Sequence, residues 1–229
     1  MAFKVLVVDD EPGIRRVLTG FLEAAGFEVH EAGTGEDAVA QVRRSVPDVV
    51  LLDVMLPGID GIEVLRRLRT FSEVYVVLVT ARAEETDTLI GLAVGADDYV
   101  TKPFSPREVV ARVKAVLRRG RSSQGHEGRL HFVDLTIDPV SRDVEAAGQQ
   151  VALSALEFDL LVALASAPGR VFSRRQLLER VWGGDFYGDE RVVDVHIRSL
   201  RKHLGDDATS PRIIGTVRGV GYKFVLELA

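Results

Sequence analysis

The sequence has no cysteine, which excludes disulfide bonds, thiolate metal sites and a cysteine nucleophile. It has no apolar run near the ~18 residues that would span a bilayer, and its N-terminal apolar stretch is too short for a secretory signal. The five histidines are scattered, so a zinc cluster is not expected. These absences predict a cytosolic chain without membrane contact. At 229 residues, the chain suits two domains of ordinary size.

The chain also has no overall excess of positive charge, because 29 Lys and Arg stand against 34 Asp and Glu and the formal net charge is −5. One stretch departs from this balance: residues 191–223 hold seven basic residues against three acids. The basic residues are Arg191, Arg198, Arg201, Lys202, Arg212, Arg218 and Lys223. Such a local excess suits contact with a polyanion better than the global charge does.

The first half of the chain alternates short apolar runs with amphipathic segments. The apolar runs predict strands at Lys4–Val8, Glu28–Ala32, Val49–Leu52, Tyr75–Val79 and Tyr99–Thr101. The amphipathic segments predict helices at Pro12–Ala25, Gly35–Arg44, Gly61–Arg69, Glu84–Val94 and Pro106–Arg119. Five strand–helix units in series imply a parallel sheet with right-handed crossovers.

The composition changes near residue 120, where the stretch GRSSQGHEG is polar and rich in glycine. Such a stretch predicts a linker. We therefore assign a first domain to residues 1–120, a linker to residues 121–128 and a second domain to residues 129–229. The second domain combines short β-like runs, three helical patterns and a final hairpin-like stretch, IIGTVRGVGYKFVLEL. We expect it to be α+β.

Polar side chains collect where the parallel strands are expected to end. Asp9 and Asp10 follow the first strand, Asp53 the third, Thr80 the fourth and Lys102 the fifth. Ligands of open α/β sheets bind at this edge. Three carboxylates there would suit Mg²⁺, and a carboxylate beside a metal can attack phosphorus to give an acyl phosphate. Each acid alone could instead cap a helix or a turn, but caps do not require five polar groups at neighbouring strand ends.

Several motifs carry a resemblance to a known family. VLVVDDE, PDVVLLDVMLPGIDG, VTA and GADDYVTKPF together resemble the receiver domain of bacterial two-component response regulators. LEFDLLVALASAPGRVFSRRQLLERVW, RVVDVHIRSLRKHLG and TVRGVGYKF resemble the winged-helix output domain of the OmpR/PhoB class. The resemblance implies an α/β flavodoxin-like receiver, with a five-stranded parallel sheet in the order 2-1-3-4-5, followed by an α+β winged helix-turn-helix domain.

The resemblance also implies roles for the acidic pocket. Asp53 would be the phosphoacceptor. Mg²⁺, for which Mn²⁺ could substitute, would be held by Asp10, Asp53 and the main-chain carbonyl of Met55, while Asp9 would act through a water molecule.

The same resemblance implies a switch. Thr80 and Lys102 would engage the phosphoryl group, and the Thr80 hydroxyl would move toward it while the ring of Tyr99 turns inward. A core aromatic is the other interpretation of Tyr99. The Lys102–Pro103 peptide would be cis. Met55 and Arg82, two residues beyond Asp53 and Thr80, would modulate the rates.

Related regulators form dimers through their receiver domains by means of salt bridges. The matching positions are Asp97, Asp98, Glu108, Arg112 and Arg119. The chain departs from the family at Thr88, where a basic residue commonly faces the acid at position 108. Since an exposed ion pair contributes little alone, we expect a weaker dimer rather than none.

One helical pattern in the second domain predicts a recognition helix. Val193, Ile197, Leu200 and Leu204 fall within a narrow arc, and Arg191, Val195, Arg198 and Lys202 lie opposite it. A solvated surface helix has the same pattern, but the resemblance favours docking in a DNA major groove. The positions expected to contact DNA are Arg191, Val195, His196, Arg198, Ser199, Arg201, Lys202, Thr216, Arg218 and Tyr222.

These observations predict a phosphorylation-dependent transcription factor. Its expected partners are a sensor histidine kinase, double-stranded promoter DNA, RNA polymerase and a second copy of the chain. A Mg²⁺-dependent phosphohydrolase is an alternative, but Met55 stands where such an enzyme needs a second acid. A regulator that ignores phosphorylation is another alternative, and it would require the loss of a pocket residue. We therefore do not expect a dedicated turnover enzyme.

Overall fold

The computed structural model describes residues 2–81, 95–122, 128–183 and 190–227. The chain divides into two compact units, Met1–Leu117 and Arg118–Ala229. Within the described residues, no helix is long and apolar enough to cross a membrane.

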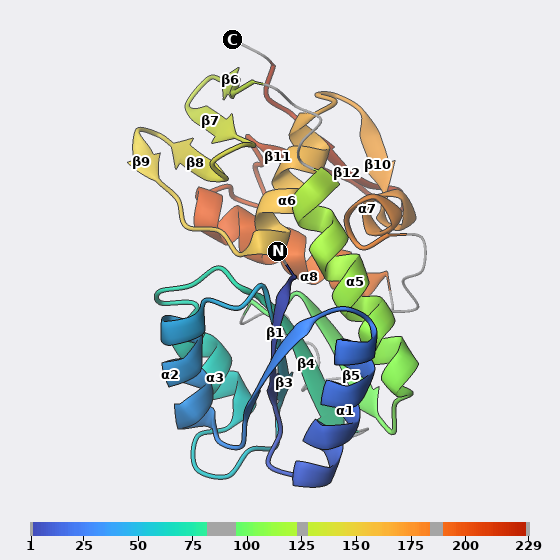
Figure 1. Ribbon diagram of the computed structural model, residues 1–229. Coiled ribbons are helices and arrows are strands. Elements are labelled where there is room, and N and C mark those ends of the chain that lie inside the picture. Colours follow the sequence, from blue (N-terminus) through green and yellow to red (C-terminus); the bar gives the residue numbers. More distant parts are fainter. Residues whose placement is uncertain (1, 82–94, 123–127, 184–189, 228–229) are drawn as a thin grey trace. The chain divides into compact units, whose positions relative to one another are not determined.

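The first unit is built on a parallel sheet with the strand order β2-β1-β3-β4-β5, which confirms the predicted order (Figure 1). Its strands are β1 (Lys4–Val8), β2 (Glu28–Ala32), β3 (Val49–Asp53), β4 (Tyr75–Ala81) and β5 (Asp98–Lys102). Its described helices are α1 (Pro12–Ala24), α2 (Gly35–Ser45), α3 (Gly61–Leu68) and α5 (Pro106–Ser122). Figure 1 shows α2 and α3 on one face of the sheet and α1 and α5 on the other. All five residues of β3 are buried, as a strand covered on both faces requires.

Several predicted boundaries in the first unit shift by one to three residues. Strand β3 includes Asp53 itself, and β4 continues through Ala81. Helix α5 extends to Ser122, so the first two residues of the assigned linker are helical. Gly120 weakens a helix but does not forbid it, so the glycine-rich composition predicted the C-terminal end of this helix too early. The predicted helix Glu84–Val94 lies outside the described residues.

The second unit is α+β. It opens with an antiparallel sheet of β6 (Leu130–Phe132), β7 (Leu135–Asp138), β8 (Asp143–Ala146) and β9 (Gln149–Gln150). The following elements are α6 (Ala155–Ala165), β10 (Val171–Ser173), α7 (Arg174–Val181), α8 (Arg191–Leu204), β11 (Ile214–Val217) and β12 (Gly221–Phe224). Strands β11 and β12 form a hairpin, and β10 joins the free edge of β12. Helices α7 and α8 with this hairpin form the predicted winged helix-turn-helix.

An ion pair between a buried glutamate and an exposed histidine joins two helices of the second unit. Ser154 and Glu157 form a capping box at the start of α6. Oε2 of Glu157 also lies 3.2 Å from Nδ1 of His203, in the last turn of α8. Burial acts to raise the pKa of Glu157, but hydrogen bonds from His203 and Ser199 outweigh it and lower this pKa to about 2. The hydrogen bond to Glu157 raises the pKa of His203 above its ordinary value.

Candidate functional site

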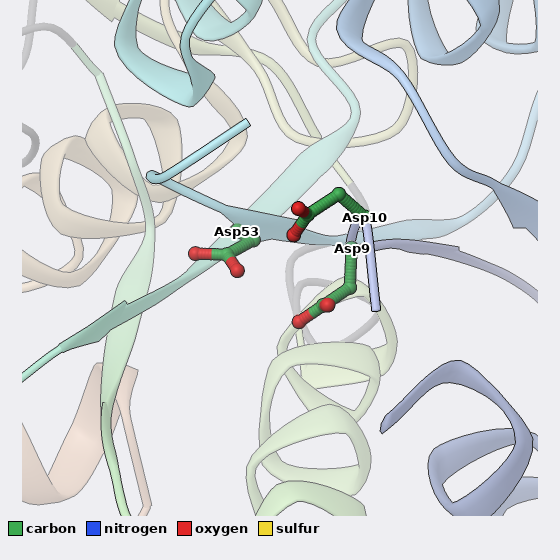
Figure 2. Close-up of side chains that lie close together, drawn as sticks. All are labelled: Asp9, Asp10 and Asp53. Carbon is green, nitrogen blue, oxygen red and sulfur yellow. The ribbon is translucent and has the colours of Figure 1, made fainter. Parts of the chain in front are cut away.

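Three carboxylates meet at the C-terminal edge of the first sheet (Figure 2). Asp9 and Asp10 directly follow β1, and Asp53 ends the adjacent strand β3. Their ligand oxygens lie within 4.8 Å of one another. Asp9 and Asp53 are buried, whereas Asp10 is exposed. The cluster therefore combines two acids fixed in the protein with one that faces solvent.

Backbone donors fix one oxygen of each buried acid. Oδ1 of Asp9 accepts a hydrogen bond of 2.9 Å from the Glu11 amide, and Oδ1 of Asp53 accepts one of 3.0 Å from the Met55 amide. The capping interpretation thus accounts for one oxygen of each residue. It does not account for Oδ2, which points in both residues to the same cation.

That cation is the ammonium group of Lys102. Its Nζ lies 2.9 Å from Oδ2 of Asp9 and 2.6 Å from Oδ2 of Asp53. Strand β4 separates β5 from β3, so the long lysine side chain reaches across one strand. The Lys102–Pro103 peptide is cis, as the resemblance implied.

The charges of this cluster do not balance. Burial acts to lower the pKa of Lys102, but hydrogen bonds with Asp53 and Asp9 outweigh it, so the pKa is raised and the ammonium stays charged. Burial raises the pKa of Asp9, and the bond from Lys102 opposes this rise only in part. One ammonium cannot neutralise three carboxylates. The cluster is therefore suited to a further cation with a preference for oxygen ligands, such as Mg²⁺.

The two predicted switch residues share one face of the sheet. Thr80 is buried near the end of β4 and is paired in register with Thr101, while Tyr99 lies two residues earlier on β5. Residues two apart on a strand point to the same face. A displacement of the Thr80 side chain would therefore act on the face where the half-buried Tyr99 ring lies.

A glycine sets how closely α3 approaches the phosphoacceptor candidate. The Gly61 amide donates a 2.9 Å hydrogen bond to the Val54 carbonyl. A Cβ atom at position 61 would overlap the carbonyl oxygen of Asp53 and lie 2.8 Å from Cα of Val54. Only glycine permits this approach. The sequence pattern placed Gly61 at the start of a predicted helix but did not predict this contact.

The second unit presents an amphipathic α8. The predicted apolar stripe of Val193, Ile197, Leu200 and Leu204 is buried. Arg191, Arg198 and Lys202 are exposed on the same helix, and Val195 and Ser199 are partly buried. In the β11–β12 hairpin, Thr216 and Arg218 are exposed beside Gly219, which has a φ of 74° at the tip.

Three residues expected to contact DNA are buried, and this expectation is corrected. His196 and Arg201 lie on the core side of α8, and Tyr222 lies on β12. Arg201 donates hydrogen bonds to the Ile214 carbonyl and the Thr216 hydroxyl. Arg201 counted as basic in the sequence, but it attaches α8 to β11, while the ring of His196 packs against that of Trp182, with ring centroids 5.6 Å apart.

Tyr222 belongs to a network that joins three elements. Its hydroxyl donates a 2.7 Å hydrogen bond to Oδ1 of Asp194 on α8. Nε of Arg174, the first residue of α7, donates a bond of 2.7 Å to the same oxygen. One carboxylate of the exposed helix is thus tied to α7 and to the hairpin. The sequence did not predict this role, because Asp194 registered only as an acid within a basic stretch.

Four of the five positions predicted at a dimer interface are engaged within the chain. Asp97 is fully buried and pairs with Arg69 at 2.9 Å, so it cannot face a partner, and that expectation is corrected. Arg112 lies 3.1 Å from Asp98 and 2.9 Å from Glu108. The side chain of Arg119 and the whole of Thr88 and Arg82 lie outside the described residues.

Comparisons with known proteins decide the family. Residues 5–114 match the response regulator receiver domain, and residues 148–224 match the C-terminal domain of transcriptional regulatory proteins. The DNA-binding response regulator MtrA of Mycolicibacterium smegmatis is 47% identical over 223 residues, with 97% of each chain covered. The chain belongs to the OmpR/PhoB family of response regulators. As a response regulator with a DNA-binding domain, it is a transcription factor rather than a classical enzyme.

Other relatives agree with this membership. The transcriptional regulatory protein SrrA of Staphylococcus aureus is 45% identical over 234 residues, which cover 99% of this chain and 97% of SrrA. The crystal structure of the response regulator DrrB, an OmpR/PhoB homologue of Thermotoga maritima, is 38% identical and covers 98% of this chain and all of DrrB, with a TM-score of 0.53. A mutant of RitR, 27% identical, covers 97% of this chain and 99% of its own with a TM-score of 0.83.

Proposed function

We propose that this response regulator accepts a phosphoryl group on Asp53 from a sensor histidine kinase. The observation that carries the proposal is the state of Asp53: a buried carboxylate at the end of β3, with one oxygen held by the Met55 amide and the other by Lys102. Such a group is oriented and close to a cation, as a nucleophile toward phosphorus needs to be.

In the proposed step, an oxygen of Asp53 attacks phosphorus while the bond from phosphorus to the kinase histidine nitrogen breaks. The carboxylate becomes an acyl phosphate, and the released imidazole retains the electron pair and can take up a proton. Lys102 and Thr80 then bind phosphoryl oxygens, which carry the charge that Asp53 carried before. The same pocket would accept a phosphoryl group from a small donor and lose it slowly to water, with Met55 and Arg82 modulating both rates.

The proposed cofactor is Mg²⁺, with Mn²⁺ able to substitute. Asp10, Asp53 and the Met55 carbonyl would hold it, and Asp9 would act through a water molecule. The carboxylate cluster supports this assignment, since hard oxygen donors are the ligands that Mg²⁺ prefers. When bound, the ion would neutralise charge on the attacking carboxylate and the phosphoryl oxygens.

The proposed output is phosphorylation-dependent dimerisation and binding to promoter DNA in the cytosol, with RNA polymerase as the final partner. Thr80 and Tyr99 would couple the phosphoryl group to the dimer surface. Asp98, Glu108, Arg112 and Arg119 remain candidates for that surface, on condition that the pairs within the chain exchange partners. Such an exchange would cost little at the exposed Glu108, but more at Asp98, whose side chain is buried in its pair with Arg112.

The residues proposed to contact DNA are those of the predicted set that stay accessible. They are Arg191, Val195, Arg198, Ser199, Lys202, Thr216 and Arg218. Arginine can make a bidentate contact with guanine in the major groove. Arg198 and Arg191 are therefore assigned to base reading, and Lys202 and Arg218 to the phosphate backbone.

The substitution Asp53→Asn tests the central step. The amide is nearly isosteric but cannot act as the nucleophile, so we expect no alkali-labile, hydroxylamine-labile phosphate after treatment with the kinase or an acyl-phosphate donor. The circular dichroism spectrum should match that of the wild type. Phosphate retained by the variant in an acid-stable, hydroxylamine-resistant linkage would place the acceptor elsewhere.

A further inference from the structure

Arg15 on α1 hydrogen-bonds to the main chain of Asp9 and Asp10, two of the clustered acids. Its Nη1 donates a hydrogen bond of 2.7 Å to the Asp9 carbonyl and one of 3.1 Å to the Asp10 carbonyl. The two acceptors are consecutive, so one guanidinium nitrogen fixes the orientation of the peptide between them. The Arg15 side chain does not touch the carboxylates in any of these contacts; it holds the backbone behind them.

The guanidinium is itself held in place from the other side. Nε of Arg15 donates a 3.2 Å hydrogen bond to Oε2 of Glu31, whose Oε1 accepts a 2.8 Å bond from the Thr19 hydroxyl. The main-chain carbonyl of Glu31 accepts a 2.6 Å bond from Gln41. Arg15 therefore lies between the acidic turn and a glutamate that is anchored by α1 and α2.

We infer that Arg15 is a positioning residue that sets how tightly Asp9 and Asp10 bind a divalent cation. The inference rests on the proposed function, since it concerns the cation of that site. Mutation of groups that orient metal ligands without touching the metal typically lowers metal affinity by about 10–100-fold. Arg15 meets this description, because it restrains both ligand-bearing residues through their carbonyl oxygens.

A lysine cannot take over this role. The planar guanidinium presents Nη1 to the two carbonyls and Nε to Glu31 at the same time, whereas an ammonium is a single point with flexible donors. The role therefore depends on the shape of the side chain as well as its charge.

The test is a calorimetric titration of the full chain with MgCl₂. We compare the wild type with Arg15→Ala, Arg15→Lys and the control Arg16→Ala, which removes an exposed arginine from the next position of the same helix. For both Arg15 variants we expect a Kd for Mg²⁺ roughly tenfold higher than that of the wild type. The control should bind like the wild type.

A second measurement separates positioning from a general loss of stability. The rise in melting temperature on addition of Mg²⁺ should shrink for Arg15→Ala and Arg15→Lys but not for Arg16→Ala. The Mg²⁺ concentration for half-maximal phosphorylation by acetyl phosphate should increase by the same factor as the calorimetric Kd. If Arg15→Ala does not fold, Arg15→Lys decides the question.

The outcomes distinguish the positioning role of Arg15 from the proposed phosphorylation of Asp53, on which it rests. A wild-type chain that binds no Mg²⁺ and gains no phosphate refutes the proposed function. A wild type that does both, together with Arg15 variants whose Kd equals that of Arg16→Ala, refutes only the positioning role. Full recovery in Arg15→Lys would show that charge alone matters and would also overturn the inference.

Discussion

Two glycines provide a matched test of how close backbone contacts support each domain. A Cβ on Gly61 would overlap the Asp53 carbonyl oxygen in the receiver, and a Cβ on Gly221 would overlap the Phe172 carbonyl oxygen in the winged-helix domain. Backbone atoms cannot rotate away as the end of a flexible side chain can. We expect Gly61→Ala to destabilise the receiver by about 3 kcal/mol, near the upper end for overpacking.

The control is Gly20→Ala, which we expect to increase the stability of the receiver rather than decrease it. Gly20 lies exposed in α1, with no atom within 4 Å of a Cβ added there. Gly20→Ala should stabilise the receiver by about 1 kcal/mol, because alanine has the higher helix propensity. The same chemical change is thus expected to have opposite effects at positions 20 and 61.

The assay can resolve the domains because the chain has one tryptophan, Trp182, buried in the winged-helix domain. Urea unfolding followed by tryptophan fluorescence reports that domain, and far-ultraviolet circular dichroism reports both. Gly61→Ala should shift only the receiver component, whereas Gly221→Ala should shift the fluorescence transition. A Gly61→Ala variant as stable as Gly20→Ala would refute the claim that α3 must approach Asp53 so closely.

Four other substitutions test separate features. Arg198→Ala should reduce the discrimination between bases at one or two positions of each half-site, by ~1–3 kcal/mol. Arg218→Ala should instead weaken binding to all sequences and reduce the dependence of the affinity on salt concentration. Titrations over a panel of single-base substitutions at two salt concentrations would measure both effects. Arg69→Ala should destabilise the receiver by about 3–5 kcal/mol in urea unfolding, since it removes the guanidinium that pairs with the buried carboxylate of Asp97. The ionised Glu157 contributes stability above its unfolded pKa of 4.5 and loses it as the pH falls toward 2. Protonated His203 contributes below 6.5 and loses its contribution as the pH rises through its raised pKa, so His203→Gln should flatten the alkaline limb of the fluorescence-monitored stability profile.

Each of these expectations has a contrary result. Uniform loss of affinity in Arg198→Ala would remove that residue from base reading. A receiver that tolerates Arg69→Ala without loss would mean that water replaces the guanidinium. An alkaline limb that persists in His203→Gln would assign the pH dependence to another group.

The sequence predicted the receiver well because its signals are local and repeated. Five apolar runs separated by amphipathic segments determine a parallel sheet, and acids at the strand ends then meet at one edge. The side of α8 that faces outward was also predictable from its apolar stripe. What the sequence could not reveal were contacts between distant positions, such as Arg69 with Asp97 or Arg15 with the Asp9 carbonyl.

The errors in the second domain have a related cause. His196, Arg201 and Tyr222 were assigned to DNA on residue type and position in a motif, but each is buried. A polar side chain on the inner side of a small domain can pay for burial by bonding to a neighbouring strand or helix. The composition of the sequence includes the charge of such a side chain but does not reveal its hydrogen bond.

The carboxylate of Asp194 separates two properties that evolution can vary independently. By binding Arg174 and the Tyr222 hydroxyl, it holds α8 at a fixed angle to α7 and the hairpin. The exposed side chains at positions 191 and 198 and the partly buried one at position 195 take no part in these two bonds. Operator preference can therefore diverge among duplicated regulators by exchange of those side chains, while the docking angle of the helix is inherited unchanged.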